Sequence, residues 1–321
     1  MPRLAALLLA LAAWSGSASA APDAYPSRPI TIIAPYPPGA TNDLTARLIG
    51  PKLSESLGQP VIVENRTGAS GNIGTALVAR SAPDGYTIMV GNDATHATNV
   101  FLYKDIGFDP VANFAPITLA VRNIIGLAAH PSAPADDMAA LIAYARAHPD
   151  KLSYGSSGTG SPHHLAGELL QQLTGITMIH VPYRGGGPAV ADLVAGQVPL
   201  VFASLAAVVP FRQAGKVKVL AVIERERYAA FPDIPTIGET VPGFELSSWL
   251  GFFAPGGTPA PIIDVLNHAI VAALRSDAVR AKLEPAGLAV VGSSPAAFAA
   301  TIRSDLERRG ELIRSRGIKP E

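Results

Sequence analysis

The stretch Pro29-Ile30-Thr31-Ile32-Ile33-Ala34 is an apolar, β-branched run that predicts a buried strand. A turn rich in Pro and Gly follows it. Residues 42–57 then have the leucine spacing of an amphipathic helix, with four side chains on or near one face: Leu44, Leu48, Leu53 and Leu57. A strand, a tight turn and a covering helix are the repeating parts of α/β sheets.

The same alternation recurs along the chain. Further strands are expected at 61–63, 87–90, 152–154, 177–181 and 200–202, and further helices at 72–80, 164–173 and 187–195. Residues 259–318 are mostly helical, with expected helices at 261–275, 276–286 and 294–316. This order predicts the α/β class, with mixed, mainly parallel sheets flanked by helices. Because no low-complexity linker is present, we expect two domains to be joined by crossing strands.

The N-terminus has the pattern of an export signal. Arg3 precedes an apolar run from Leu4 to Trp14, and Ala18-Ser19-Ala20 has the small-x-small pattern of a cleavage site. The run is too short to span a bilayer. A buried N-terminal helix is the alternative, but it leaves both Arg3 and the cleavage pattern unexplained. We therefore expect residues 1–20 to be removed and the protein to be periplasmic.

Composition excludes several classes of function. Lys plus Arg and Asp plus Glu are balanced at 25 each, without basic runs, so the charge pattern of nucleic-acid binding is missing. The chain has no Cys, which excludes disulfides, Cys-ligated metals and a lipid-anchored cysteine. At 48% hydrophobic residues, the chain has enough apolar side chains for two cores.

Three turns at the carboxyl ends of expected strands are rich in Gly, hydroxyl and amide residues: 36–43, 65–72 and 155–162. In open α/β sheets, ligands bind at such strand ends. Glycines let backbone N–H groups approach a ligand closely, and a helix N-terminus attracts an anion. Each turn taken alone is also explained as a plain turn or helix cap, but three at equivalent strand ends indicate an anion site built from neutral donors.

Other chemistries are less well supported. His163 and His164 are adjacent on a helix, so their rings diverge and do not share a metal, and Asp93 with His96 lacks a third ligand. No dinucleotide or phosphate-binding glycine motif is present. Residues 155–159 fail the nucleophile-elbow pattern at the last position. We expect no metal, no cofactor and no catalysis, and keep as an alternative an exported serine hydrolase that uses a serine of 156–161 with His163, His164 and Asp192.

Five segments together resemble the Bug family, the solute receptors of tripartite tricarboxylate transporters. They are Pro35–Gly39 with Asp43, Asn65–Gly74, Ala82–Thr87, His180–Gly185, and Gly256–Pro259 after Trp249. The resemblance implies a two-lobed periplasmic-binding-protein fold of type II, or Venus flytrap. It places one lobe at 21–124 plus 248–321 and the other at 125–247.

The resemblance also implies that two facing loops grip a carboxylate, partly through ordered water. The expected ligand-binding residues are Tyr36, Pro37, Gly39, Ala40, Thr41, Asn42, Asp43, Ser70, Gly71, Thr95, Ser156, Ser157, Gly158, Thr159, Ser161, Tyr183 and Ser204. The expected ligand is a di- or tricarboxylate, an aromatic carboxylate or a similar small acid, captured by lobe closure. The expected partners are membrane transporter subunits, with a signalling protein as the alternative, and we expect a monomer.

The chain departs from the family pattern at four positions. Gly39-Ala40 and Ser70-Gly71 stand where Gly-Gly pairs are usual, and many relatives carry acidic residues where this chain has Pro199 and Ala203. An acidic side chain near the cleft would pair with an amino group. Its absence predicts a ligand that carries no amino group.

Overall fold

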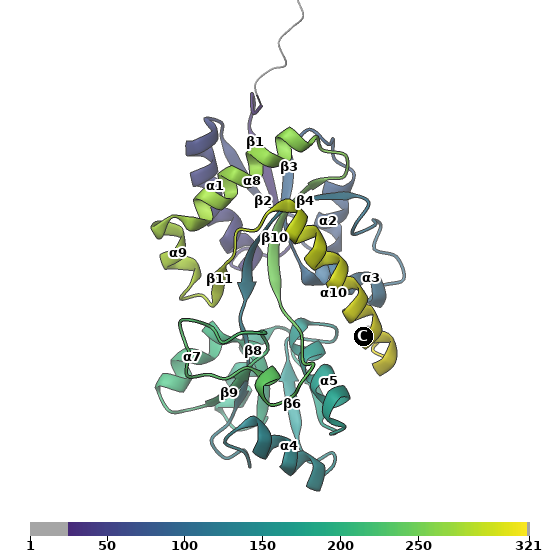
Figure 1. Ribbon diagram of the computed structural model, residues 1–321, viewed down its shortest axis with the longest axis vertical. Coiled ribbons are helices and arrows are strands. Elements are labelled where there is room, and N and C mark those ends of the chain that lie inside the picture. The colour runs from purple at the N-terminus through teal and green to yellow at the C-terminus, as the bar shows by residue number, and fades with distance from the viewer. Residues whose placement is uncertain (1–24, 320–321) are drawn as a thin grey trace, which may run out of the picture.

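The computed structural model describes residues 25–319, which form two α/β lobes stacked end to end (Figure 1). The expected signal segment, residues 1–20, lies outside the described residues. Each lobe has one β-sheet with helices packed on its faces, so the expected two-lobed α/β architecture is confirmed.

The first lobe contains a six-stranded sheet in the order β11-β4-β10-β3-β1-β2. Its strands are β1 (Ile30–Ala34), β2 (Val61–Asn65), β3 (Thr87–Asn92), β4 (Phe114–Asn123), β10 (Trp249–Pro255) and β11 (Leu288–Val290). The helices are α1 (Thr41–Leu57), α2 (Asn72–Ala79), α3 (Asn99–Leu102), α8 (Ala260–Arg275), α9 (Asp277–Leu283) and α10 (Pro295–Arg316), with short turns η1 (Ala69–Gly71) and η2 (Ala94–Thr98). Leu53 of α1 and Leu266 of α8 are both completely buried, which confirms the predicted amphipathic helices on this sheet.

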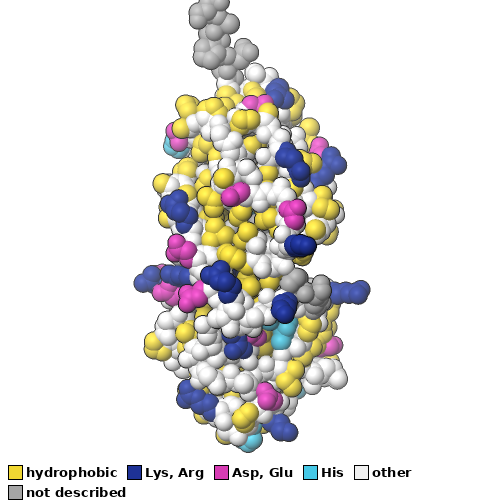
Figure 2. Space-filling view, turned by 90° about the vertical axis from the view of Figure 1, so that its right-hand side faces the viewer, with side chains coloured by type: hydrophobic (Ala, Val, Ile, Leu, Met, Phe, Trp, Pro, Cys, Tyr) yellow, Lys and Arg dark blue, Asp and Glu magenta, His cyan; other side chains and the backbone are white. Residues whose placement is uncertain are grey.

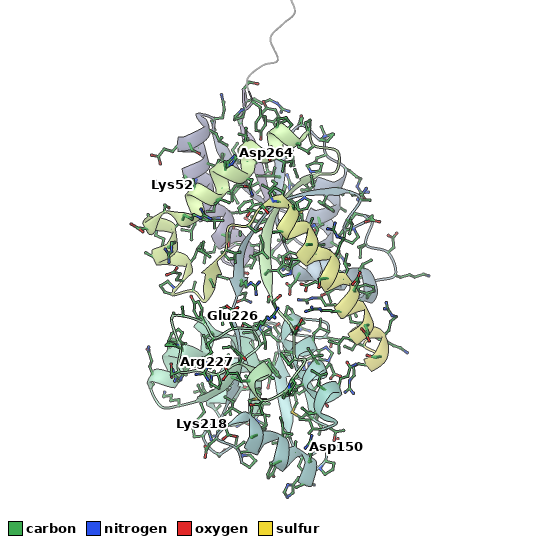
Figure 3. The ribbon with its side chains drawn as sticks, in the orientation of Figure 1. Lys52, Asp150, Lys218, Glu226, Arg227 and Asp264 are labelled. Atoms are coloured by element: carbon green, nitrogen blue, oxygen red, sulfur yellow. The ribbon has the colours of Figure 1, made fainter. Side chains whose placement is uncertain are left out.

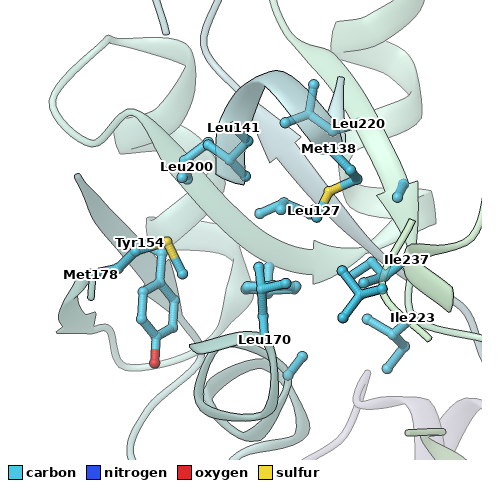
Figure 4. Close-up of a cluster of buried hydrophobic side chains, with 14 of the residues drawn as sticks. Leu127, Met138, Leu141, Tyr154, Leu170, Met178, Leu200, Leu220, Ile223 and Ile237 are labelled. Atoms are coloured by element: carbon cyan, nitrogen blue, oxygen red, sulfur yellow. The ribbon is translucent and has the colours of Figure 1, made fainter. Parts of the chain in front are cut away.

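The second lobe contains a five-stranded sheet in the order β7-β6-β8-β5-β9. Its strands are β5 (Ile125–Ala129), β6 (Ser153–Ser156), β7 (Ile179–Pro182), β8 (Leu200–Ser204) and β9 (Lys218–Val222). The helices are α4 (Met138–Ala147), α5 (Pro162–Thr174), α6 (Gly186–Val194) and α7 (Leu205–Gln213), followed by the short turn η3 (Ile237–Glu239). Leu127, Leu170 and Leu200 meet in the core between the sheet and its helices (Figure 4).

Both sheets are mixed, as expected, but the parallel pairings do not predominate. β1 runs parallel to β2 and β3, and β6 runs parallel to β7 and β8. The other pairings, which involve β4, β5, β9, β10 and β11, are antiparallel. Most strands of each sheet nevertheless run in one direction, as expected, and the described strands that run against it are β5, β10 and β11. Of these, β5 and β10 follow the two passages between the lobes.

The chain passes between the lobes twice. β4 ends at Asn123 and β5 begins at Ile125. On the return, Leu246 still packs in the second-lobe core, so the passage is Ser247 and Ser248, directly before Trp249, the first residue of β10. The two passages are bonded together, since the Asn123 amide donates to the Ser248 carbonyl at 2.9 Å. The lobes are therefore connected by short, hydrogen-bonded segments, which are suited to hinge motion.

Helix α10 connects the lobes by a third route. It begins against the first sheet, where Phe298 and Ile302 join a buried cluster with Trp249. It ends beside α5 of the second lobe (Figure 1), where Leu312 and Ile313 are part of that lobe's core. The C-terminal end of a helix that starts in one lobe is thus packed into the other.

Candidate functional site

A cavity of about 450 Å³ lies between the two lobes. This volume is within the usual range for small-molecule sites. The described residues that line it come from both lobes, and none of them is Asp, Glu, Lys or Arg: Tyr36, Ser70, Asn92, Ala94, Asn99, Leu102, Tyr103, Ser157, Thr159, Gly160, Ser161 and Pro162. The cavity is therefore polar without a fixed charge.

The lining residues that come from the first lobe form one wall of the cavity, and Ser70 is at its centre. The Ser70 carbonyl accepts hydrogen bonds from the Tyr36 hydroxyl at 3.0 Å and from Asn99 Nδ2 at 3.1 Å. The Ser70 hydroxyl lies 2.7 Å from the Tyr103 hydroxyl. Ala69 and Ser70 have φ angles of 46° and 52°, in the left-handed region that costs energy for residues other than Gly. Such strain is often found at functional sites.

Asp43 supports this wall from behind rather than facing the ligand space. Its carboxylate accepts from the Gly39 amide at 2.9 Å, and from Arg47 Nε and Asn65 Nδ2 at 2.8 Å each. Burial raises the pKa of Asp43, but the hydrogen bonds from Gly39, Asn65 and Arg47 outweigh it, so the pKa lies below its usual value. Asp43 is thus an ionised carboxylate that fixes the β1–α1 loop.

A π-helical turn, η2, forms the floor of the cavity on the side of the first lobe. Thr95 is buried and exchanges hydrogen bonds with Asn92, which lines the cavity. His96 stacks on Phe253 with ring centroids 3.7 Å apart. Burial lowers the pKa of His96 to about 3, so its ring is neutral. π-Helical turns are rare and are frequent at functional sites, where they re-aim side chains.

The second-lobe wall is the loop between β6 and α5. Ser161 caps α5, accepting from the His164 amide at 3.2 Å, and both Ser161 and Pro162 line the cavity at the helix N-terminus. The α5 macrodipole therefore points its positive end at the ligand space. The Ser157 hydroxyl, which also lines the cavity, lies 2.6 Å from His163 Nδ1.

The Ser157–His163 pair does not make a catalytic triad. His163 Nε2 is buried without a hydrogen-bond partner among the described residues, so no carboxylate orients the ring. Asp192, the expected acid, accepts instead from the Tyr183 hydroxyl at 2.9 Å. Burial lowers the pKa of His163 to about 4, which keeps the imidazole neutral. The geometry favours Ser157 as a hydrogen-bonding group over Ser157 as a nucleophile.

The structure brings some of the sequence-predicted residues to the cavity and places others nearby. Five line it: Tyr36, Ser70, Ser157, Thr159 and Ser161. Others support these walls through hydrogen bonds or close packing, namely Gly39, Asn42, Asp43, Gly71, Thr95, Ser156 and Gly158. Pro37, Ala40, Thr41, Tyr183 and Ser204 are not among the lining residues, and Ser204 instead bonds to Asn123 at the lobe passage at 2.8 Å.

Seven lining residues were not among the expected ligand-binding residues, although the last two lie in the predicted 155–162 turn: Asn92, Ala94, Asn99, Leu102, Tyr103, Gly160 and Pro162. A signal for Asn92 existed, because it ends a strand of the parallel part of the first sheet, but the predicted strand stopped at residue 90. Leu102 and Tyr103 carried no local signal. They reach the cavity only because α3 packs against Gly160 of the other lobe.

Within residues 25–319, no cluster of His, Asp and Glu side chains has the arrangement of a metal site. No helix in the same range is both long and apolar enough to cross a membrane. Pro199 and Ala203, whose neutrality guided the ligand prediction, do not line the cavity, and Ala203 packs in a hydrophobic cluster. The neutral lining of the cavity itself is the better argument for a ligand without an amino group.

Two α/β lobes, two short passages between them and a polar cavity at their junction define a two-lobed solute-binding protein. Solved structures agree with this class. An R. palustris protein with adipate is 38% identical, with a TM-score of 0.79, and covers 92% of this chain and 100% of its own. MatC from Rhodopseudomonas palustris with bound malate is 34% identical, with a TM-score of 0.75, and covers 90% and 100%.

The family follows from the sequence comparisons. The family model described as "Tripartite tricarboxylate transporter family receptor" matches residues 45–318. The protein BugT of Bordetella pertussis is 36% identical over 322 residues, which cover 99% of each chain. The chain belongs to this family of solute-binding receptors, and the resemblance to the Bug family is confirmed.

Proposed function

We propose that this protein is a periplasmic receptor that captures a small organic carboxylate without an amino group and delivers it to a tripartite transporter in the membrane. In this proposal the first lobe consists of residues 21–124 and 248–321, and the second lobe consists of residues 125–247. The ligand lies in the interlobe cavity, where Tyr36, Ser157 and Ser161 contact it. The lobes close over it by hinge motion at the two passages.

The observation that carries the proposal is the neutral, donor-rich lining of the cavity. Its hydroxyl and amide groups, together with the N-terminus of α5, offer hydrogen bonds to an anion. Each charge-assisted hydrogen bond contributes about 1.5–3 kcal/mol. Four or five of them, less an association cost of at least ~4 kcal/mol, give micromolar affinity without a cationic side chain.

The solved relatives support the ligand class. One of the two R. palustris structures contains adipate, and the other, MatC, contains malate. Both ligands are small dicarboxylates without amino groups. Both proteins cover 90% or more of this chain. The lining of this cavity contains no acidic side chain that would pair with an ammonium group, which favours such acids over amino acids.

Calorimetric titration of the purified protein tests the proposal. The panel contains adipate, malate, citrate and benzoate, with glutamate, putrescine and glucose as comparisons. We expect at least one acid of the first group to bind with a Kd of about 1 µM and to raise the melting temperature. Stabilisation by putrescine or glucose with no response to any carboxylate would contradict the proposal.

Delivery to a transporter needs a separate test. We expect a strain that lacks this gene to lose uptake of the radiolabelled acid identified in the titration, and the restored gene to recover it. Normal uptake without the gene, combined with loss of a transcriptional response to the acid, would identify the protein as the ligand-presenting subunit of a signalling system instead.

A further inference from the structure

The C-terminal turn of α10 makes an ion pair with the second lobe. Arg316 Nε lies 2.7 Å from Glu168 Oε2, and the side chains are 32% and 11% exposed. α10 starts against the first sheet and Glu168 lies on α5, so this pair joins elements of different lobes. Figure 2, which views the molecule from the right-hand side of Figure 1, shows Lys and Arg side chains interspersed with Asp and Glu side chains around its middle.

Glu168 is held by several further donors. Its Oε1 accepts from the Tyr154 hydroxyl and from Gln171 Nε2, each at 2.9 Å. Although burial raises the pKa of Glu168, hydrogen bonds from His164, Arg316 and Tyr154 lower it to about 2. The carboxylate is therefore ionised, and Arg316 is the cation that balances its charge.

His164 connects Glu168 to the cavity. The Gly160 amide donates to His164 Nδ1 at 3.0 Å, so the ring proton is on Nε2, which lies 3.6 Å from Glu168 Oε1. Gly160 lines the cavity with a φ of 76°. His164 also stacks on His180 with centroids 3.8 Å apart, and His180 Nε2 is 2.7 Å from the Ser156 hydroxyl. A continuous set of contacts thus leads from α10 to the β6–α5 loop.

Apolar contacts accompany the ion pair. Leu312 and Ile313, on the last turns of α10, are almost completely buried in the core of the second lobe. At the cavity, Leu102 of the first lobe contacts Gly160 so closely that a Cβ at Gly160 would lie 2.1 Å from Leu102 Cδ1. The lobes are therefore in contact at both ends of the Glu168–His164–Gly160 connection, through α10 at one end and through Leu102 at the other.

We propose that Arg316 is an interlobe latch: by pairing with Glu168 it stabilises the closed arrangement of the lobes, and through His164 it positions the Gly160 turn of the cavity. Arg316 does not line the cavity and acts as a positioning residue. The part of the proposal that concerns ligand affinity rests on the proposed function. The part that concerns lobe closure does not.

The interlobe distance tests closure without a ligand. Because the chain has no Cys, Asp264→Cys on α8 (Figure 3) and Ala147→Cys on α4 give two unique sites for spin labels, one in each lobe. We expect the labelled protein to populate the short distance of this structure, and Arg316→Ala to shift the population towards longer distances. Arg316→Lys, which keeps the charge, should recover part of the short-distance population, whereas raising the salt concentration should reduce it in the unmutated protein.

Arg303→Ala is the matched control. Arg303 is exposed on the same helix, and no hydrogen bond or ion pair is found for it among the described residues. We expect this variant to keep the unmutated distances. Identical distributions for Arg316→Ala and Arg303→Ala, or an unmutated protein that lacks the short distance, would overturn the latch. Circular dichroism of each variant confirms that it is folded.

The affinity for the tightest-binding acid of the titration panel gives a second readout. Arg316→Ala should raise its Kd about tenfold, mainly through faster dissociation. If distances shift but no carboxylate binds the unmutated protein, the proposed function fails and the latch stands. If carboxylates bind and Arg316→Ala changes neither distances nor Kd, the latch fails and the proposed function stands.

Discussion

Arg309 Nη2 lies 2.8 Å from Asp93 Oδ2, and the two side chains are only 1% and 2% exposed. Arg309 is on α10, and Asp93 caps the π-helical turn η2 behind the cavity. The same nitrogen donates to the Ser247 carbonyl, on the return passage between the lobes, and Nη1 lies 3.2 Å from the Thr98 hydroxyl. One guanidinium therefore connects the C-terminal helix, the cavity floor and the hinge.

We predict that Arg309→Ala lowers the free energy of unfolding by about 3–5 kcal/mol, because it leaves the Asp93 carboxylate buried without its cation. Urea denaturation measures this. The exposed Arg303→Ala on the same helix should change the free energy by less than about 0.5 kcal/mol. Equal stability of the two variants would show that the buried pair has no structural role.

Glu224 predicts a pH dependence of stability. It is 4% exposed, and burial raises its pKa from 4.5 to about 8, although Oε1 accepts a long, 3.4 Å hydrogen bond from the Ile125 amide. The folded protein therefore keeps a proton that the unfolded chain loses near pH 4.5. Stability contributed by this group is complete below pH 4.5 and is lost as the pH rises towards 8.

Glu224→Gln should remove the loss of stability that accompanies the rise in pH. Between pH 5 and pH 8 the unmutated protein should lose on the order of 3 kcal/mol more stability than the variant. Glu226→Gln, exposed on the same loop (Figure 3), is the control and should keep the unmutated pH profile. Parallel profiles for Glu224→Gln and the unmutated protein would mean that Glu224 is ionised in the fold.

Gly160→Ala tests the contact between the lobes at the cavity. The added Cβ meets Leu102 at 2.1 Å, so we predict incomplete closure and roughly tenfold weaker carboxylate binding, measured by calorimetry. Gly175→Ala is the matched control, since its φ of 70° is similar and no atom lies within 4 Å of its Cβ position. It should lower stability by about 1 kcal/mol and leave affinity unchanged. Adding Leu102→Ala to Gly160→Ala should restore binding, and failure to do so would assign the defect to local backbone strain.

Ser157→Ala removes a proposed hydrogen bond to the ligand. Loss of one charge-assisted hydrogen bond should raise the Kd about 10-fold to 100-fold. Ser81→Ala, at a half-buried position just after α2 that does not line the cavity, should have no effect on the Kd. A serine-reactive phosphonate should label neither the unmutated protein nor Ser157→Ala, and selective labelling of the unmutated protein would favour the hydrolase alternative.

Local patterns predicted the strands β1, β2, β3, β6, β7 and β8 and the longer helices of the first lobe, but not the strands β4, β5, β9, β10 and β11. The strand from Ile30 and the helix ending at Leu57 appear within one residue of their expected positions, because apolar periodicity and turn residues are local signals. The antiparallel entry of β10 was not predicted, since strand direction depends on how the chain returns between the lobes. Apolar periodicity and turn residues do not report the direction of a strand in its sheet.

The site was only partly predictable for the same reason. Tyr36, Ser70, Ser157 and Ser161 follow strands, so the strand-end rule found them. Leu102 and Tyr103 line the cavity through packing between lobes, which no local pattern reports. The Arg316–Glu168 contact joins residues 148 positions apart and requires the path of α10 to be known.

The most direct test of the central claim is a crystal structure with the tightest-binding acid of the panel. We predict a carboxylate in the interlobe cavity within hydrogen-bonding distance of Tyr36, Ser157 and the N-terminus of α5, with no Lys or Arg side chain against it. A ligand bound outside this cavity, or one whose charge is neutralised by a cationic side chain, would contradict the account.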